Sequence, residues 1–303
     1  MLEQLDNSNI SKHLGKSSEY KAEYDASLLV REPRASNRTH LGISDDAPPF
    51  VGNDTWNNYE VSGLMHNGVP VTAVAKIVYP ATNKYIVESK SLKLYFGSFH
   101  MTKLGDTPAA VREAIAQIAA KDLSALLETT AQVRCYSDAE IFAKSVTAHT
   151  EWEHDRYVTL EESIDTTKLV TTTYMETPEL LEVVDRAGAI HYHSSLLRSR
   201  CRVTSQPDSG DIYIYIKGVK TVSDTSLLKY IISFRDECHF HEEICEAVYK
   251  RLWDLLQPEE LSVKCLYARR GSIDINPERV SHAHLLHNTL SNVGVHYVKT
   301  PRQ

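Results

Sequence analysis

The chain of 303 residues is poor in cysteine, and none of its five cysteines forms a Cys-x-x-Cys pair. Zinc sites usually need such paired ligands, so the sequence predicts no metal centre. An odd number of cysteines, with no secretory signal, favours reduced thiols, and we expect a cytoplasmic protein. At least one of these thiols is therefore a candidate for chemistry rather than for a disulfide.

Long apolar runs and an excess of basic residues are also missing. No stretch approaches the roughly 18 uninterrupted apolar residues of a membrane helix, and residues 1–18 are too polar for a signal peptide. The formal net charge of -7 disfavours nucleic acid as a partner, because phosphate backbones require a basic surface. We therefore expect a small-molecule substrate, and neither nucleic acid nor membrane as a partner.

The order of predicted elements repeats along the chain. Alternating residues predict strands at 59–65 and 69–79, joined by an Asn-Gly turn signal. The segment ESKSLKLYFGSF at 88–99 comes next and is taken as a first helix. A second helix follows, with Thr107 at its N-cap and Pro108 at its first position, and a strand is expected at 130–136. The first half therefore predicts strand, strand, helix, helix, strand.

The second half predicts the same order. Strands are expected at 194–204 and 211–217, helices at 225–236 and 239–256, and a last strand at 262–269. Because the order strand, strand, helix, helix, strand occurs twice, the sequence predicts an α+β protein with two antiparallel sheets, each backed by a pair of helices.

The predicted domains follow from this repeat. They are an irregular N-terminal arm at 1–55, a first module at 56–150, a connection at 151–185 and a second module at 186–303.

The segment 197–208 carries the strongest signal for chemistry. Cys201 stands between Arg200 and Arg202 at the end of a predicted strand, and two positive charges favour thiolate over thiol. Asp208 follows a proline in a turn, where its side chain can point back over the strand end. A thiolate and a nearby acid are the minimum set for covalent addition to an electrophilic carbon. A buried structural cysteine and a turn-forming aspartate are the alternative.

His241 and Glu242 begin a predicted helix. The helix dipole favours acidic residues at this end, which by itself explains Glu242 and Glu243. The pair of His241 and Glu242 is also suited to reading one edge of a ligand or to moving a proton. The sequence HEEIC lacks the second histidine of an HExxH zinc motif, which leaves zinc as a weak alternative.

Two further segments are suited to anion binding. Lys90 and Lys93 share one face of a helix in segment 86–95, where they can bind phosphate or form an ordinary solvated helix start. Gly271 follows two arginines, Arg270 among them, and lets backbone N–H groups approach an anion. No GxGxxG or P-loop is present, so a dinucleotide would bind outside a Rossmann fold.

Taken together, these segments resemble the NADPH-dependent 7-cyano-7-deazaguanine reductases of queuosine biosynthesis, in their long two-module form. The motif E-S-K-S-hydrophobic-K-L-Y stands at 88–95, C-x-x-T-x-Q-P-D at 201–208, and F-H-E at 240–242. R-R-G followed by D-I-N-P stands at 269–277, and LGK, YDASLL, PR and NR recur between 14 and 38. Several motifs in one order carry the resemblance over most of the chain.

The resemblance implies a tandem tunnelling fold of two ββααββ modules, a homodimer, and reduction of the substrate nitrile to an aminomethyl group with NADPH. It implies that Cys201 attacks the nitrile carbon to give a thioimide, that Asp208 donates protons, and that His241 belongs to the catalytic set. The implied substrate site is Val87, Glu88, Ser89, His241 and Glu242. The implied NADPH contacts are Ser89, Lys90, Arg270 and Gly271.

Three positions depart from the family pattern. Ser209 stands where many members have tryptophan, and Ser272 stands where a second glycine is common. Ile244 replaces a cysteine that can protect the nucleophile as a disulfide, and Cys245 is one position further on.

Two other functions fit the same motifs. An amidine-forming relative would let ammonia, rather than hydride, react with the thioimide, but the retained Lys90, Arg270 and Gly271 favour the reductase. A purine- or pterin-binding module without catalysis would not need Cys201 and Asp208 at this spacing.

Overall fold

The structure is a computed structural model that describes residue 21 and residues 23–143, 156–202, 204–295 and 303. The LGK motif at 14–16 lies outside the described residues. No helix among the described residues is long and apolar enough to cross a membrane.

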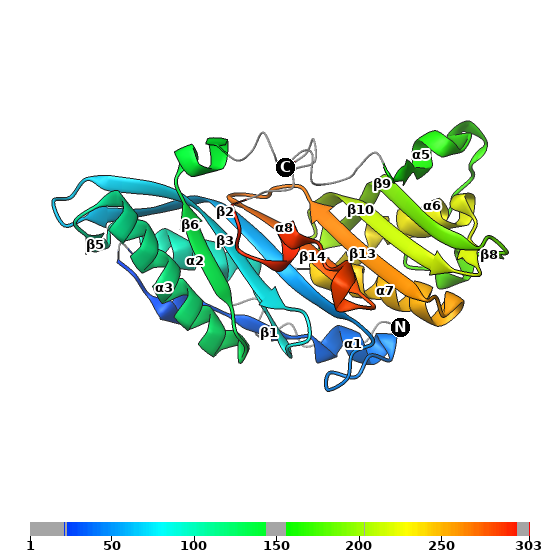
Figure 1. Ribbon diagram of the computed structural model, residues 1–303, viewed down its shortest axis with the longest axis horizontal. Helices are drawn as coiled ribbons and strands as arrows, with labels where there is room; N and C mark the ends of the chain where they lie inside the picture. The colour runs from blue at the N-terminus through cyan, green and yellow to red at the C-terminus, as the bar shows by residue number, and fades with distance from the viewer. Residues whose placement is uncertain (1–20, 22, 144–155, 203, 296–302) are drawn as a thin grey trace.

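A ten-stranded sheet runs the length of the molecule (Figure 1). Its main path is β12-β9-β10-β13-β14-β2-β3-β6, with β5 beside β2 and β7 beside β9. The strands are β2 (Val51–Met65), β3 (Pro70–Pro80), β5 (Lys103–Gly105), β6 (Gln132–Tyr136), β7 (Val158–Thr159), β9 (Gly188–Cys201), β10 (Pro207–Gly218), β12 (Cys238–His239), β13 (Glu260–Tyr267) and β14 (Ile273–Val280). Two small sheets pair β1 (Arg31–Pro33) with β4 (Tyr85–Val87), and β8 (Val183–Val184) with β11 (Thr221–Val222).

The expectation of two separate sheets is wrong, because β14 joins the two halves. This strand pairs antiparallel with β13 on one side and with β2 on the other. Its pairing with β2 runs from Ile273 opposite Asn58 to Val280 opposite Val51. The same pairing extends β2 back to Val51, so the predicted irregular arm at 1–55 ends earlier than expected.

The helices are α1 (Ala35–Leu41), α2 (Ser89–Ser98), α3 (Pro108–Leu127), α5 (Leu160–Ser163), α6 (Asp224–Ser233), α7 (His241–Leu256) and α8 (Asn288–Ser291). The predicted start of α3 is confirmed: Thr107 is its N-cap, and the Thr107 hydroxyl accepts a hydrogen bond from the N–H of Ala110 at 3.1 Å. Pro108 occupies the first turn, where a missing N–H costs nothing.

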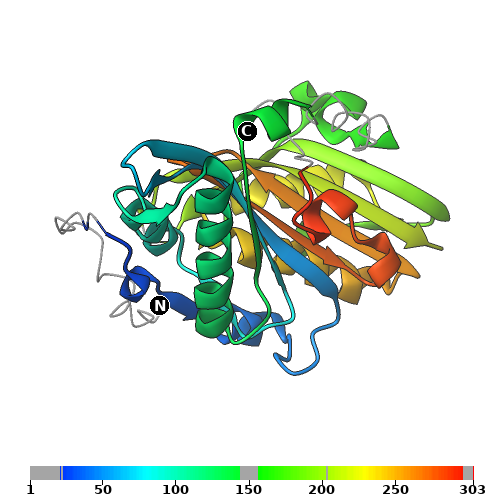
Figure 2. The same cartoon turned by 60° about the vertical axis from the view of Figure 1, so that its left-hand side comes forward.

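Two hydrophobic cores lie on the helix-covered face of the sheet. Ile212, Ile214 and Ile216 of β10 pack in one core with α6 and α7, which lie behind β9 and β10 in Figure 1. Alternate residues of β3, including Ala75 and Ile77, pack in the other core with α2 and α3. In Figure 2 the long helix α3 comes forward at the other end of the sheet. The predicted alternation of the strands is therefore confirmed, and each half has its own pair of helices.

Buried charges fix the arm against both halves of the sheet. Arg38 of α1 donates two hydrogen bonds to Glu246 of α7, at 2.9 and 2.8 Å. Arg279 of β14 binds Asp54 of β2 at 2.8 Å and Glu246 at 2.9 Å, and Arg34 is ion-paired with Asp54 as well. All of these side chains are almost fully buried. The N-terminal segment, β2, β14 and α7 are thus held in one arrangement by charges that have no access to water.

Candidate active site

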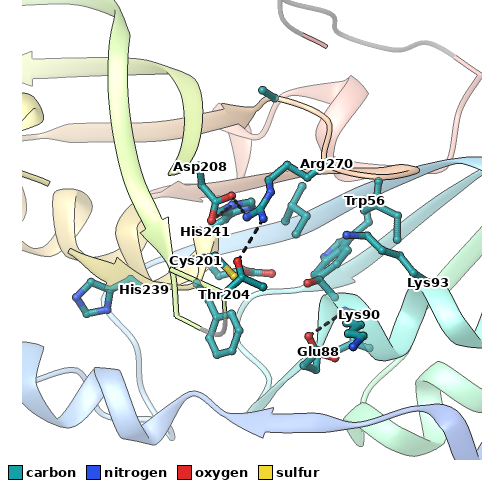
Figure 3. A pocket seen from close by; sticks show the side chains of 17 residues that line it. Trp56, Glu88, Lys90, Lys93, Cys201, Thr204, Asp208, His239, His241 and Arg270 are labelled. Carbon is teal, nitrogen blue, oxygen red and sulfur yellow. Dashed lines mark hydrogen bonds and ion pairs between the residues drawn. The ribbon is translucent and has the colours of Figure 1, made fainter. Parts of the chain in front are cut away.

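A cavity of about 170 Å³ opens at the junction of the two halves (Figure 3). Its lining is Trp56, Val87, Glu88, Ser89, Lys90, Lys93, Cys201, Thr204, Asp208, His239, Phe240, His241, Glu242, Ala268, Arg270, Ile273 and Ile275. The residues expected at the site therefore meet in one place, although they come from segments far apart in the sequence. Gly271 alone among them is not in the lining.

Four chain segments converge on the cavity. The first residues of α2, which follows β4, and of α7, which follows β12, line the cavity. Residues of the turn from β9 to β10 and of the loop after β13 complete the lining. The short strand β12 pairs in parallel with β9 and places His239 opposite Cys201. This pairing brings the first residues of α7 beside the end of β9.

Cys201 is the last residue of β9 and is partly exposed. Its backbone N–H donates to the Gln206 carbonyl at 2.8 Å, and its carbonyl accepts from the Ser205 N–H at 2.9 Å. Ser205 has a φ of 56°, in the left-handed region that side chains rarely adopt. The turn after Cys201 is thus tightly held and positions the thiol at the cavity.

Asp208 lies on β10, close to Cys201, and is 3% exposed. Arg270 forms an ion pair with its Oδ1, and Nε2 of His241 lies 3.4 Å from its Oδ2. Burial alone would raise the pKa of Asp208, but the hydrogen bond and charge of His241, followed by those of Arg270, hold the pKa below its usual value. Asp208 is therefore a carboxylate in this arrangement, between two groups that can carry positive charge.

His241 is stacked on the ring of Tyr267, with 3.7 Å between ring centroids and 6° between ring planes. Its second nitrogen, Nδ1, is buried and has no hydrogen-bond partner among the described residues. The ring is therefore fixed in orientation while one of its polar atoms remains unsatisfied, which is costly unless a ligand supplies the partner.

Glu242 follows in the first turn of α7 and is 2% exposed. Its Oε1 also has no hydrogen-bond partner within the described structure. Burial raises the pKa of Glu242 to about 8, and the charge of Asp54 adds to this rise, against the opposing effect of Arg34. A buried carboxyl group with an unsatisfied oxygen at a cavity wall is suited to accept hydrogen bonds from a ligand.

Glu88 is the N-cap of α2 as well as a lining residue. One carboxylate oxygen accepts the N–H of Lys90 at 2.8 Å and the other accepts the N–H of Ser91 at 2.6 Å. Two of the orphan donors at the start of α2 are satisfied in this way. The sequence indicated Glu88 only as a substrate contact, and its capping role was missed.

The basic groups lie on the side of the cavity formed by α2 and the loop after β13. Lys93 lines the cavity one turn after Lys90, and a side chain added at Gly271 would have its Cβ 3.5 Å from Cε of Lys93. Burial lowers the pKa of Lys93, and the charge of Arg270 lowers it further. Gly271 has a φ of 60°, which favours glycine. Two lysines, an arginine and a glycine loop together suit the phosphates of a dinucleotide such as NADPH.

The arginines next to Cys201 in the sequence, which are expected to favour its thiolate, are each engaged by another group. Arg202 forms an ion pair with Glu243 at 3.1 Å, and Arg200 donates to the Asp236 carbonyl at 3.0 and 3.2 Å. Arg270, Lys93 and Lys90 line the cavity with Cys201, and so does His239, which stands opposite Cys201 in the pairing of β12 with β9. Burial alone would lower the pKa of His239, but its hydrogen bonds to Glu237 and Glu243 raise that pKa to about 9.

Cys245 is placed away from the cavity. It is fully buried in α7, and its thiol donates to the carbonyls of Val263 and Pro277. Burial raises the pKa of Cys245 well above its usual value, and Cys265 is its neighbour there. This environment disfavours a protective disulfide between Cys245 and Cys201.

Several lining residues were missed or given no role from the sequence: Trp56, Thr204, His239, Phe240, Ala268, Ile273 and Ile275. Lys93 was indicated as a candidate for phosphate binding, because it lies three residues after Lys90 on the same helical face. Trp56 had none, since it sits in the part of β2 that only its pairing with β14 reveals.

Comparisons with known proteins agree with this geometry. Residues 20–135 match the family model described as "Nitrile reductase, 7-cyano-7-deazaguanine-reductase N-term", and residues 207–285 match the one described as "QueF-like protein". A relative from Colwellia psychrerythraea, named NADPH-dependent 7-cyano-7-deazaguanine reductase, is 38% identical over 89% of this chain and 91% of its own length. Relatives of the same name from Burkholderia orbicola and Cupriavidus metallidurans are 41% and 39% identical, over 89% of this chain and 93% and 92% of theirs. The chain therefore belongs to the NADPH-dependent 7-cyano-7-deazaguanine reductase family.

Proposed function

We propose that this protein reduces the nitrile of 7-cyano-7-deazaguanine to the aminomethyl group, with NADPH as the hydride donor. The observation that carries the proposal is the convergence of Cys201, Asp208 and Glu242 on one cavity that also holds a group of cations. The names of relatives that share about two fifths of the sequence support the same reaction.

We assign recognition of the base to the polar atoms of the cavity that have no hydrogen-bond partner among the described residues. The donor edge of a guanine-like base offers N–H groups to the Glu242 carboxylate, and an acceptor on the base can be matched by the indole N–H of Trp56. Nε1 of Trp56 and Oε1 of Glu242 both lack partners among the described residues. A base without the matching groups would leave these atoms buried and unpaired, which gives the site its selectivity.

Covalent addition falls to Cys201. Its thiolate sulfur forms a bond to the nitrile carbon as one π bond of C≡N breaks, and the nitrogen takes a proton to give a thioimide. One hydride and one proton reduce the C=N bond of the thioimide. Loss of the Cys201 thiol then leaves an imine, and a second hydride and proton complete the amine. Two NADPH are consumed for each nitrile.

The protons are assigned to Asp208 with His241. Asp208 is held as a carboxylate by its neighbours, so it must receive a proton before it can act as an acid. His241 lies 3.4 Å from its Oδ2 and can deliver that proton. This arrangement makes His241 and Asp208 a short relay toward the substrate nitrogen.

The phosphates of the cofactor are assigned to Lys90, Lys93 and Arg270, with the backbone of Ser89 and Gly271. When bound, NADPH would supply the hydrides that reduce the former nitrile carbon. The residues of this chain would hold the cofactor and orient the base, and the lining residues Trp56, Asp208 and Glu242 are themselves buried.

The proposal is tested by following NADPH absorbance when the purified protein is mixed with 7-cyano-7-deazaguanine. We expect two NADPH oxidised for each substrate, and no oxidation with Cys201→Ala. Cys245→Ser is the matched control and should retain the activity. Formation of an amidine from ammonia, without NADPH oxidation, would support the amidine-forming alternative instead.

The tandem tunnelling fold, its module boundaries and the homodimer stay predictions. Light scattering of the purified protein would measure the mass in solution, and a mass of one chain would contradict the homodimer.

A further inference from the structure

His241 begins the proposed relay, yet hydrogen bonds do little to orient its ring. Its Nε2 lies 3.4 Å from Oδ2 of Asp208, beside which it stands in Figure 3, and its Nδ1 is buried with no hydrogen-bond partner among the described residues. One contact of that length leaves the imidazole free to tilt, because it restrains one atom and not the plane of the ring. Packing must therefore set the plane of His241.

Tyr267, the last residue of β13, provides that packing. Its ring is stacked on His241, with 3.7 Å between the ring centroids and 6° between the ring planes. Tyr267 is fully buried in the core between the sheet and α7, so its ring has little room to follow a moving histidine. The residue lies outside the cavity lining, and no signal in the sequence pointed to it.

The stack depends on Gly210, which is paired with Tyr267 across β10 and β13. A Cβ at position 210 would lie 3.2 Å from Cδ1 of Tyr267 and 2.9 Å from the carbonyl oxygen of Leu266. Because glycine has no side chain, the tyrosine ring can lie close against β10, only two residues along the strand from Asp208. The support of His241 and the carboxylate that it contacts are thus built into the same pair of strands.

We propose that Tyr267 is a positioning residue for the addition of Cys201 to the nitrile. Its ring holds the His241 imidazole in the plane in which Nε2 faces Oδ2 of Asp208, so that a proton passes from His241 to Asp208 and on to the nitrile nitrogen. A misplacement of about 1 Å in such a group can cost about a hundredfold in rate. This role rests on the proposed relay of His241 and Asp208.

The ring of Tyr267, and not its hydroxyl, carries this role. The hydroxyl is buried and has no hydrogen-bond partner among the described residues, so phenylalanine can replace tyrosine without leaving another group unpaired. Tyr267→Phe keeps the stacked ring, whereas Tyr267→Leu removes the ring and keeps an apolar side chain in the core. The two variants therefore separate the stack from the other contributions of the residue.

The test is the rate at which 7-cyano-7-deazaguanine adds to Cys201 without NADPH, followed by rapid quenching and intact-protein mass spectrometry. Tyr267→Phe should react at nearly the wild-type rate, and Tyr267→Leu about tenfold more slowly. Substrate affinity should change little in either variant, when calorimetry measures it in a Cys201→Ala background that blocks addition. This split is expected because a misplaced relay slows addition without removing the groups that bind the base.

Proton NMR of the ligand-free protein reports the position of His241 directly. The ring protons of His241 lie against the face of Tyr267, whose ring current should shift them upfield, and they are assigned as the signals missing from His241→Asn. The upfield shift should persist in Tyr267→Phe and disappear in Tyr267→Leu. A wild-type spectrum without the shift would show that the stack does not form, which would end the proposal.

Tyr249→Leu is the matched control, because Tyr249 is a fully buried tyrosine of α7 whose ring is stacked on Trp253 with 12° between the planes. This variant should lower stability but leave the rate of addition unchanged. Equal slowing in Tyr249→Leu and Tyr267→Leu would trace the effect to a loosened α7, and a slow Tyr267→Phe would transfer the role to the hydroxyl. Either result would overturn the proposal.

Two further outcomes separate this role from the reaction itself. A wild-type rate in Tyr267→Leu would remove Tyr267 from the reaction while nitrile addition stands. A wild type that forms no adduct would instead contradict the proposed function, and the role of Tyr267 with it. If Tyr267→Leu does not fold, Tyr267→Met makes the same test, because its flexible side chain fills irregular gaps and also lacks a ring.

Discussion

Replacing Glu242 with glutamine should stabilise the ligand-free protein relative to wild type by an amount that grows between about pH 4.5 and pH 8, while it weakens binding of the substrate. Glu242 is 2% exposed, and its Oε1 has no partner among the described residues. Burial raises its pKa to about 8, from an ordinary value near 4.5, with Asp54 as the next cause. The folded protein therefore keeps a proton that the unfolded chain has already released.

The sign and size of the effect follow from this proton. Between about pH 4.5 and pH 8 the folded state binds more protons than the unfolded state, so this group makes the free energy of unfolding fall as pH rises. Each pH unit in the window is worth about 1.4 kcal/mol, which gives a loss of about 5 kcal/mol by pH 8 and no further loss above it. Glutamine has nearly the same shape as glutamate but does not titrate. The free energy of unfolding of the Glu242→Gln protein therefore does not fall for this reason as pH rises.

Urea unfolding of both proteins at pH 5 and at pH 9 measures the effect. The difference in unfolding free energy between Glu242→Gln and wild type should grow in favour of glutamine by several kcal/mol over this range. Titrating groups that do not interact with Glu242 cancel in that difference. Calorimetry at pH 7 in two buffers of unlike ionisation enthalpy should show that substrate binding releases a proton in wild type, and that Glu242→Gln binds more weakly without release. A stability difference that does not change with pH would refute the reasoning.

Three further predictions concern the nucleophile, the acid and the helix caps. Without NADPH, intact-protein mass spectrometry should show one substrate added to wild type and to Cys245→Ser but none to Cys201→Ala; an adduct on another cysteine would contradict the assignment. Asp208→Asn should form the adduct slowly or not at all, because an amide cannot donate a proton as an acid does, and wild-type adduct rates would remove Asp208 from the mechanism. Glu88→Ala and Thr107→Ala each remove a helix cap and should lower the free energy of unfolding by about 1 kcal/mol. Only the Glu88 variant should raise KM, and equal KM values would leave Glu88 with a structural role alone.

The local signals in the sequence were sufficient for most of the elements at the site. The cap at Thr107, the alternation of β10 and the helix that begins near His241 depend on contacts within a few residues, and all three occur as expected. Glu88 and Cys201 also line one cavity, as expected. That expectation rested on the family motifs and not on local sequence patterns.

The strand that joins the halves could not be predicted in this way. β14 contains Pro277, which cannot donate to a ladder and argues against a central strand. The strand nevertheless pairs on both sides, with Pro277 opposite Asp54, and the Pro277 carbonyl accepts from Cys245. Local sequence patterns alone predict two sheets, because they do not reveal the long-range pairing of β14 that makes them one sheet.

An ion pair between β2 and β14 links the way the two halves are joined to the chemistry of the site. Asp54 belongs to β2 and Arg279 to β14, and their ion pair at 2.8 Å crosses the joint between the halves. Asp54 is also one of the groups that raise the pKa of Glu242, which enters the cavity from α7. A substrate that offers N–H donors favours the Glu242 carboxylate, whereas the charge of Asp54, from the other half of the molecule, opposes it. The affinity of the site for its base therefore depends on how the two halves are joined, and a change at Asp54 or Arg279 should alter substrate binding without touching the substrate.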